Sequence, residues 1–262
     1  MKSKHVQFFY FSGTGNTYLV VRKMQKVLEE LGMEVQLRRI EESGPEDVDI
    51  SKTIGVGFPV AILSTYPMVW DFIENLPMAQ GTEIFMVDTL GGFSGGIVGP
   101  IRRKVKIRGY KPVGACEIVM PSNIFYIQDQ RASTQKIEKG LGSADEYARR
   151  LVEGKTSWSR VPLISDFIYF ISILSWKLTA WKIHQRYLKF KTHKEKCNQC
   201  GICADLCPTH NILMNDFPVS RGECNYCLRC VSFCPMGAIP CFFNYKGKTY
   251  RAAKAKELLE GK

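Results

Sequence analysis

Two runs of cysteines near the C-terminal end share the spacing Cys-x2-Cys-x2-Cys-x3-Cys-Pro. The first run consists of Cys197, Cys200, Cys203 and Cys207, and the second consists of Cys224, Cys227, Cys230 and Cys234. Three thiolates at this spacing can surround one corner of an iron–sulfur cubane in a tight loop, with main-chain N–H groups facing the inorganic sulfides. The repeated pattern therefore predicts two 4Fe-4S clusters.

The fourth cysteine of each run stands too far along the chain to join the first three. In two-cluster ferredoxins this cysteine binds the other cluster. We therefore predict that Cys234 completes the first site and that Cys207 completes the second. Structural zinc sites are the alternative, but they usually pair two Cys-x2-Cys units without a third cysteine and a trailing Cys-Pro. Disulfides are disfavoured because the sequence opens without a signal peptide and the ligands must stay reduced, so a reducing cytoplasm is expected.

A second group of chemically suggestive residues follows an apolar, aromatic stretch near the N-terminus. This loop consists of Ser12, Gly13, Thr14, Gly15, Asn16 and Thr17, and a helical pattern continues from it to Leu31. Strand, short loop and helix together form an anion site, because the loop N–H groups and the helix N-terminus point at one place. A Walker loop and a dinucleotide fingerprint each require a different glycine spacing, and neither is present. The loop therefore predicts a bound phosphate group.

Strand-like and helix-like segments alternate through the first 155 residues. Strand candidates are 5–11, 34–38, 53–58, 83–88 and 113–120, and later helix candidates are 67–76, 97–108 and 134–153. This alternation predicts a parallel α/β sheet. The connection 41–52 looks too short for a full helix, and Gly140–Asp145 is expected to break the last helix.

The loop from Ser12 to Thr17 resembles the phosphate loop of flavodoxins, which hold the terminal phosphate of FMN with hydroxyls and main-chain amides and no lysine. The resemblance implies a flavodoxin-like, doubly wound, five-stranded parallel sheet of order 2-1-3-4-5 with FMN beyond the carboxyl ends of the strands. Two more loops should then reach the flavin. Their candidate binding residues are Pro59, Val60, Ala61 and Tyr66 in one loop, and Thr89, Gly91, Gly92, Phe93, Gly95 and Gly96 in the other.

The glycines of the second flavin loop would let main-chain N–H groups approach the ring edge closely. Tyr66 and Phe93 are candidates for stacking on the ring, although packing in the core is the simpler role for each. The loop Pro121–Asn123 follows the fifth strand candidate and could cap the site.

Positive charge is concentrated in two stretches that flank the cysteine runs. The net charge is +11, of which residues 177–196 contribute +6 and residues 246–262 contribute +4. Such stretches fit a solvated face, docking of an acidic redox partner, or contact with an anionic membrane. No recognition motif accompanies the charge, so nucleic acid is not an expected partner. Residues 167–191 fit a helix packed on the protein or an amphipathic helix in peripheral contact with a membrane.

The order of the segments resembles a fused flavodoxin–ferredoxin family of anaerobic bacteria and archaea. We expect a flavodoxin-like FMN domain at 1–155, a connecting helical segment at 156–192, an α+β two-cluster ferredoxin domain at 193–245 and a basic tail at 246–262. The resemblance implies low-potential electron transfer between a one-electron partner and FMN through two 4Fe-4S clusters, with delivery to a partner reductase. A reductase that acts directly on a small molecule and a redox sensor remain open as alternatives.

Overall fold

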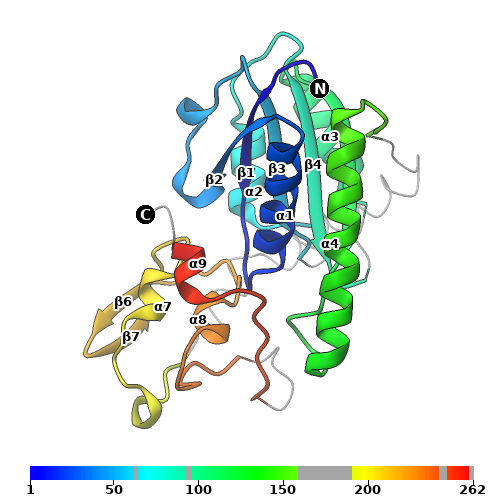
Figure 1. Ribbon diagram of the computed structural model, residues 1–262. Helices are drawn as coiled ribbons and strands as arrows, with labels where there is room; N and C mark the ends of the chain where they lie inside the picture. Colours follow the sequence, from blue (N-terminus) through cyan, green and yellow to red (C-terminus); the bar gives the residue numbers. More distant parts are fainter. Residues whose placement is uncertain (62–63, 93–95, 159–190, 242–246, 260–262) are drawn as a thin grey trace.

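Five parallel strands form the central sheet of the computed structural model, which describes residues 1–61, 64–92, 96–158, 191–241 and 247–259 (Figure 1). The strands are β1 (His5–Tyr10), β2 (Glu34–Arg39), β3 (Thr53–Pro59), β4 (Glu83–Leu90) and β5 (Lys111–Val119). Their order is β2-β1-β3-β4-β5, and all four neighbouring pairs are parallel. This order confirms the predicted flavodoxin-like sheet, and the strand ends differ from the predicted ones by one or two residues.

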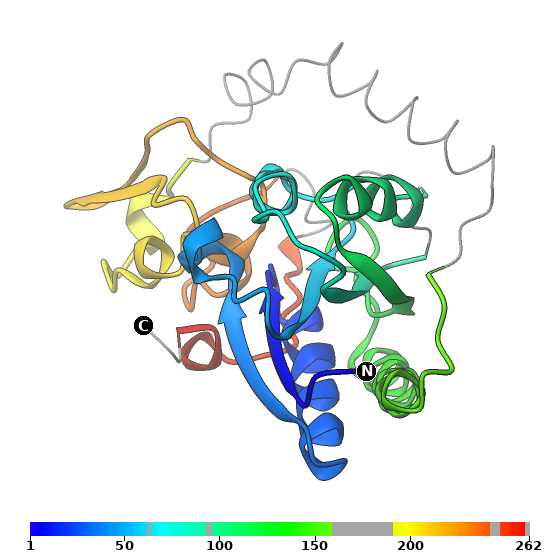
Figure 2. The ribbon, with the colours of Figure 1, turned by 90° about the horizontal axis from the view of Figure 1, so that it is seen from above.

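Helices cover both faces of the sheet. They are α1 (Asn16–Glu30), α2 (Pro67–Glu74), α3 (Val98–Ile107) and α4 (Gln130–Val152). One apolar core joins the sheet to α1 and α4, and a second core joins its other face to α2 and α3. Figure 2 shows this arrangement from above. Neighbouring strand residues alternate between the two cores, so Phe8 belongs to the first and Phe9 to the second.

Helix α4 runs without interruption through Gly140, so the predicted helix break is wrong. A Cβ atom at Gly140 would lie 2.5 Å from the sulfur of Met120 and 3.2 Å from the carbonyl oxygen of Val119. The glycine therefore permits α4 to approach the end of β5 closely. A packing requirement, and not a turn, accounts for this glycine.

The connection between β2 and β3 contains two short turns instead of a full helix. These are the 3-10 turns η1 (Ile40–Glu42) and η2 (Pro45–Asp47). The first turn directly follows the strand that lies beside β1. It places the Glu41 side chain at the edge of the sheet, where the C-terminal region reaches it.

The C-terminal region is a small α+β unit, as predicted, and it lies beside the end of the sheet to which β1 runs (Figure 1). Its elements are η3 (Lys194–Lys196), α7 (Ile202–Asp205), β6 (Ile212–Asn215), β7 (Phe217–Ser220), α8 (Arg229–Ser232) and α9 (Ala255–Leu259). Strands β6 and β7 form an antiparallel pair.

Nearly all of the predicted connecting helix at 167–191 lies outside the described residues. Within the described ranges, no helix combines the length and apolar character needed to cross a membrane.

Candidate functional site

The loop between β1 and α1 presents main-chain donors that no described residue uses. Among the hydrogen bonds of the described residues, none has the N–H group of Gly13, Thr14 or Gly15 as its donor. Gly15 has a φ of 106°, a left-handed conformation that favours glycine. Because these donors stand at the start of a 15-residue helix, they form the kind of anion site that the sequence predicts.

A pocket next to this loop gathers residues from four loops at the carboxyl ends of the strands. The predicted site residues that line it are Ser12, Gly13, Thr14, Asn16, Thr17, Pro59, Val60, Tyr66, Thr89 and Gly91. The candidate capping loop contributes Pro121, Ser122 and Asn123. The pocket lies where the order of a doubly wound sheet reverses, which is the usual ligand site of this architecture.

Four other predicted residues do not line this pocket: Gly15, Ala61, Gly92 and Gly96. Phe93 and Gly95 lie outside the described residues, so their predicted roles stay predictions. Leu90, which lies within the second predicted flavin loop, and Ile124 also line the pocket, although neither is among the predicted binding residues. Both are apolar residues beside predicted loop positions, and only this adjacency could have suggested them.

Side-chain hydrogen bonds connect the phosphate loop to its neighbours. The hydroxyl oxygens of Thr17 and Thr89 lie 2.7 Å apart, which links the loop to the end of β4. Asn123 donates from Nδ2 to Thr14 Oγ1 at 3.2 Å, and Asn16 donates from Nδ2 to the Pro121 carbonyl at 2.8 Å. The loop after β5 thus holds the phosphate loop in place, which gives the Pro121–Asn123 segment a structural role at the site.

Tyr66 forms part of the wall between this pocket and the second cysteine run. Its ring contacts Phe11 edge-on with centroids 5.1 Å apart, and it shares an apolar cluster with Cys227. Burial raises the pKa of the Tyr66 hydroxyl above its usual value, and the nearby Cys227 adds to this effect. Tyr66 is therefore a neutral, packed residue with one side on the pocket.

The first predicted set of cluster ligands faces a single small pocket. Cys197, Cys200, Cys203 and Cys234 all line it, together with apolar residues that include Ile202 and Ile239. We call these four cysteines the distal group, to distinguish them from the second set, whose Cys227 lies against Gly13 of the phosphate loop. Cys200 is exposed, whereas Cys203 is buried.

The second predicted set also lies close together, and we call it the proximal group. Burial raises the pKa of the Cys230 thiol far above its usual value, and the other three members, Cys207, Cys224 and Cys227, raise it further by their charges. Burial likewise raises the pKa of Cys227 to about 12, while the Arg229 charge opposes that rise. A metal centre binds the thiolate form, so its binding to these buried cysteines must release protons.

Both cysteine runs place main-chain donors on their sulfurs in the same way. The N–H groups of Gln199 and Tyr226 point to the first sulfur of each run at 3.4 and 3.3 Å. The N–H groups of Asn211 and Ala238 point to the last sulfur at 3.2 and 3.3 Å. Such N–H···S contacts stabilise thiolates that bind a cluster.

No three His, Cys, Asp or Glu side chains of the described residues converge on one metal ion. A cubane binds each thiolate through a different iron, so its ligands surround a larger volume than a single ion needs. The spread of each cysteine group is compatible with such a centre.

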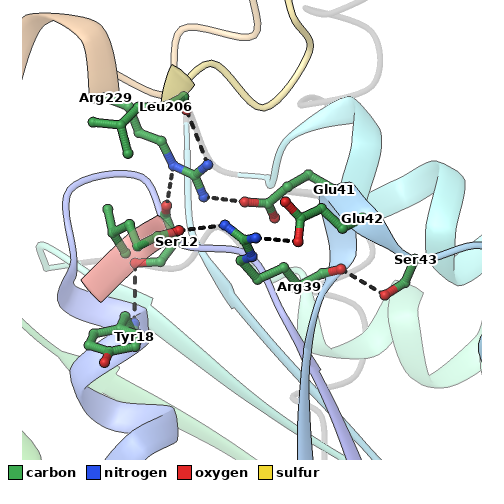
Figure 3. A network of polar contacts seen from close by, with 9 residues as sticks. Ser12, Tyr18, Arg39, Glu41, Glu42, Ser43, Leu206 and Arg229 are labelled. Carbon is green, nitrogen blue, oxygen red and sulfur yellow. Dashed lines mark hydrogen bonds and ion pairs between the residues drawn. The ribbon is translucent and has the colours of Figure 1, made fainter. Parts of the chain in front are cut away.

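The phosphate loop and the proximal group are in direct contact. A Cβ atom at Gly13 would lie 2.7 Å from the carbonyl oxygen of Cys227. Beside this contact, Arg229 donates from Nε to the Ser12 carbonyl at 2.9 Å and from Nη2 to Glu41 at 2.5 Å (Figure 3). The side chains of Arg229 and Glu41 are each 4% exposed, so this is a buried ion pair.

The C-terminal segment 250–258 lies against the outer side of the phosphate loop, and we call it the strap. Ala252 donates its N–H to the Thr14 carbonyl at 2.8 Å, and the Tyr250 hydroxyl donates to Asn16 Oδ1 at 2.7 Å. A Cβ atom at Gly15 would lie 2.6 Å from the Ala253 nitrogen. The predicted basic tail therefore contributes directly to the surroundings of the loop.

A family model described as "4Fe-4S binding domain" matches residues 190–213 and 217–239. The two matched segments contain one cysteine run each, and they imply two 4Fe-4S clusters. No curated protein sequence matches the chain.

Several solved structures resemble the N-terminal region. A flavodoxin from the domain Archaea has a TM-score of 0.40 and 16% identity, and the alignment covers 55% of this chain and 98% of that protein. The two-electron reduced flavodoxin of Megasphaera elsdenii has a TM-score of 0.40 and 22% identity, with 54% of this chain and 98% of that protein covered.

The rubredoxin oxygen:oxidoreductase of Desulfovibrio gigas has a TM-score of 0.44 and 16% identity, with 59% of this chain covered, and the chain spans only 38% of that protein. At such scores and identities the fold assignment rests on the strand order itself. That order, with the phosphate loop after β1, implies FMN as the cofactor of the sheet. The chain thus joins a flavodoxin-like α/β domain to a 4Fe-4S binding domain, an arrangement suited to electron transfer.

Proposed function

We propose that this protein carries electrons between a one-electron partner protein and FMN, through a 4Fe-4S cluster at the distal group and another at the proximal group, and delivers them to a partner reductase. The observation that carries the proposal is the contact between the Gly13 loop and the Cys227 loop, because it brings the two kinds of site together. A flavin takes up one or two electrons and a cubane takes up one, so the two cofactors would connect single-electron and pairwise chemistry.

The residues of each site fit the cofactor assigned to it. The N–H groups of Gly13, Thr14 and Gly15, which no described residue accepts, would bind the FMN phosphate, and the hydroxyls of Ser12 and Thr17 stand beside them. Four thiolates in each cysteine group, with main-chain donors on their sulfurs, form the ligand set of a cubane. We propose a reducing cytoplasm as the compartment, since these thiolates must stay reduced.

The arrangement of the groups supports an order of transfer. The proximal group contacts the phosphate loop and Tyr66, whereas the distal group includes the exposed Cys200. We infer that the distal group exchanges electrons with the partner and that the proximal group exchanges them with FMN. Electron transfer in either direction is compatible with this order.

A basic edge beside the distal group favours an acidic partner. Lys191, Lys194 and Lys196 are exposed, and all three precede Cys197 by at most six residues. The segment is held in place, since Thr192 donates to the Pro218 carbonyl at 2.9 Å and the Lys194 ammonium lies 5.4 Å from the Phe217 ring centroid. Long-range attraction by such charges speeds the encounter of oppositely charged proteins.

The test is anaerobic reduction by a ferredoxin-linked donor, followed by flavin absorbance. Replacing a distal ligand in Cys200→Ser should slow flavin reduction strongly, while Cys116→Ser should leave the rate unchanged, because Cys116 lies in β5 and belongs to neither group. Iron content and FMN content are measured for each variant, so that loss of a cofactor is separated from loss of transfer. Equal rates of flavin reduction in Cys200→Ser and Cys116→Ser would refute the proposed route.

A further inference from the structure

Arg229 contacts segments of both cofactor sites. Its guanidinium donates to the Ser12 carbonyl in the phosphate loop and, from Nη1 at 3.3 Å, to the carbonyl of Leu206, which precedes the proximal ligand Cys207. It also lies over the Phe11 ring, 5.0 Å from the centroid. Figure 3 shows the side chain lying between the Ser12, Leu206 and Glu41 partners. A single buried cation thus joins the two sites.

The two cysteine runs provide an internal comparison for this residue. Arg229 directly precedes Cys230, and Ile202 occupies the same position before Cys203. Both residues begin a four-residue helix after a left-handed residue, Leu228 in one run and Gly201 in the other. The scaffold therefore does not need an arginine at this position, and the charge is specific to the proximal run.

The charge of Arg229 acts on the proximal cysteines at short range. Arg229 directly precedes Cys230, and its guanidinium bonds the carbonyl of Leu206, the residue next to Cys207. Its buried partner Glu41 has an Oε2 atom without a hydrogen-bond partner among the described residues. The two opposite charges therefore sit at the edge of the proximal group with little solvent to screen them.

We propose that Arg229 is a positioning residue that couples the two sites: it fixes the phosphate loop against the proximal cysteine loop, and its charge raises the reduction potential of the proximal cluster, while Glu41 lowers that potential. This inference rests on the proposed function. One-electron reduction adds one negative charge to the centre held by the four thiolates. A nearby cation stabilises the reduced form and a nearby anion destabilises it.

The test is an anaerobic redox titration of both clusters, followed by electron paramagnetic resonance, in the full-length protein. Arg229→Met should lower the potential of one cluster, and Glu41→Gln should raise the potential of that same cluster. Each variant should change its ratio of reduced to oxidised centres, at a fixed solution potential, by roughly tenfold or more. The other cluster should titrate as in the wild type.

Two further variants keep the test decisive if Arg229→Met loses iron. Arg229→Lys retains the positive charge but loses the planar guanidinium that bonds Ser12, Leu206 and Glu41 together. The potential of the proximal cluster should therefore stay near the wild-type value, while the affinity for FMN should fall. Arg149→Met is the control, because Arg149 pairs with Asp145 on α4 and lies in neither cysteine group, so this variant should leave both potentials unchanged.

The outcomes separate this inference from the proposed function. A wild-type protein that assembles fewer than two clusters contradicts the proposed function. Two assembled clusters whose potentials shift together, or shift in the same direction in Glu41→Gln and Arg229→Met, overturn the role of Arg229 and leave the proposed function standing. Shifts in opposite directions confined to one cluster support the inference.

Discussion

Gly13 is the residue at which a single added methyl group would disturb both sites. In Gly13→Ala the new Cβ would lie 2.7 Å from the Cys227 carbonyl oxygen, whereas ordinary contacts of this kind begin at 3.4 Å. One of the two backbones must therefore move by several tenths of an ångström. Cys227 is a proposed cluster ligand and is buried, so the phosphate loop is the segment expected to yield.

Overpacking of this size costs about 1–3 kcal/mol. If the cost appears as weaker FMN binding, the dissociation constant of FMN rises roughly 5- to 150-fold. The loop N–H groups lose their common direction when the loop moves, which is why we expect the loss in FMN affinity. The iron content should stay at the wild-type level.

The assay is titration of flavin fluorescence with the protein under anaerobic conditions. Gly142→Ala is the control, because a Cβ at that position of α4 meets no atom within 4 Å. Unfolding by urea is measured alongside, to show that the variant is folded. A dissociation constant for Gly13→Ala within twofold of that for Gly142→Ala would refute the reasoning.

Three further outcomes follow from the described contacts. Tyr250→Phe loses the hydrogen bond to Asn16 and should lower the free energy of unfolding by about 1 kcal/mol in urea titrations, whereas Tyr126→Phe, at a position 73% exposed, should not. Burial, with a smaller contribution from Glu117, raises the pKa of the Asp88 carboxyl well above its unfolded value of 3.8, so the folded state binds the extra proton. Stability should therefore fall as the pH rises from about 4 towards that raised pKa, and Asp88→Asn should remove this part of the pH dependence; equal slopes in both proteins from pH 5 to 8 would contradict it. Removal of iron by a chelator should expose residues 197–234 to proteolysis and release FMN, since the proximal group supports the phosphate loop; retention of FMN by the iron-free protein would contradict this coupling.

Local patterns in the sequence predict the sheet and the loops at its end, while the contacts between the two domains leave no such pattern. The alternation of strands and helices predicts a parallel sheet, the resemblance of the Ser12–Thr17 loop to that of flavodoxins implies the strand order, and cysteine spacing predicts the two groups of thiols. Arg229 reads locally as one more surface charge, yet its partners Ser12 and Glu41 stand 217 and 188 residues away. The periodicity of apolar residues along the sequence reports only local structure, so it cannot indicate a contact between residues about 200 positions apart.

The same limit explains one wrong prediction and one contact that the sequence does not indicate. Gly140 suggests a helix break when only neighbouring residues are considered, but its role depends on Met120, which lies in the segment after β5. The sequence shows the positive charges of the strap, but it does not show that the strap packs against the phosphate loop.

During synthesis, the phosphate loop emerges long before the strap that packs against it. Tyr250 and Asn16 are 234 residues apart, and a ribosome that adds about 5–20 residues per second needs roughly 10–50 s to make the second partner after the first. For that interval the phosphate loop exists without its outer wall. A nascent chain would therefore hold flavin weakly until the cysteine-rich region had been made, which would delay the appearance of a reactive flavin without its iron–sulfur neighbours.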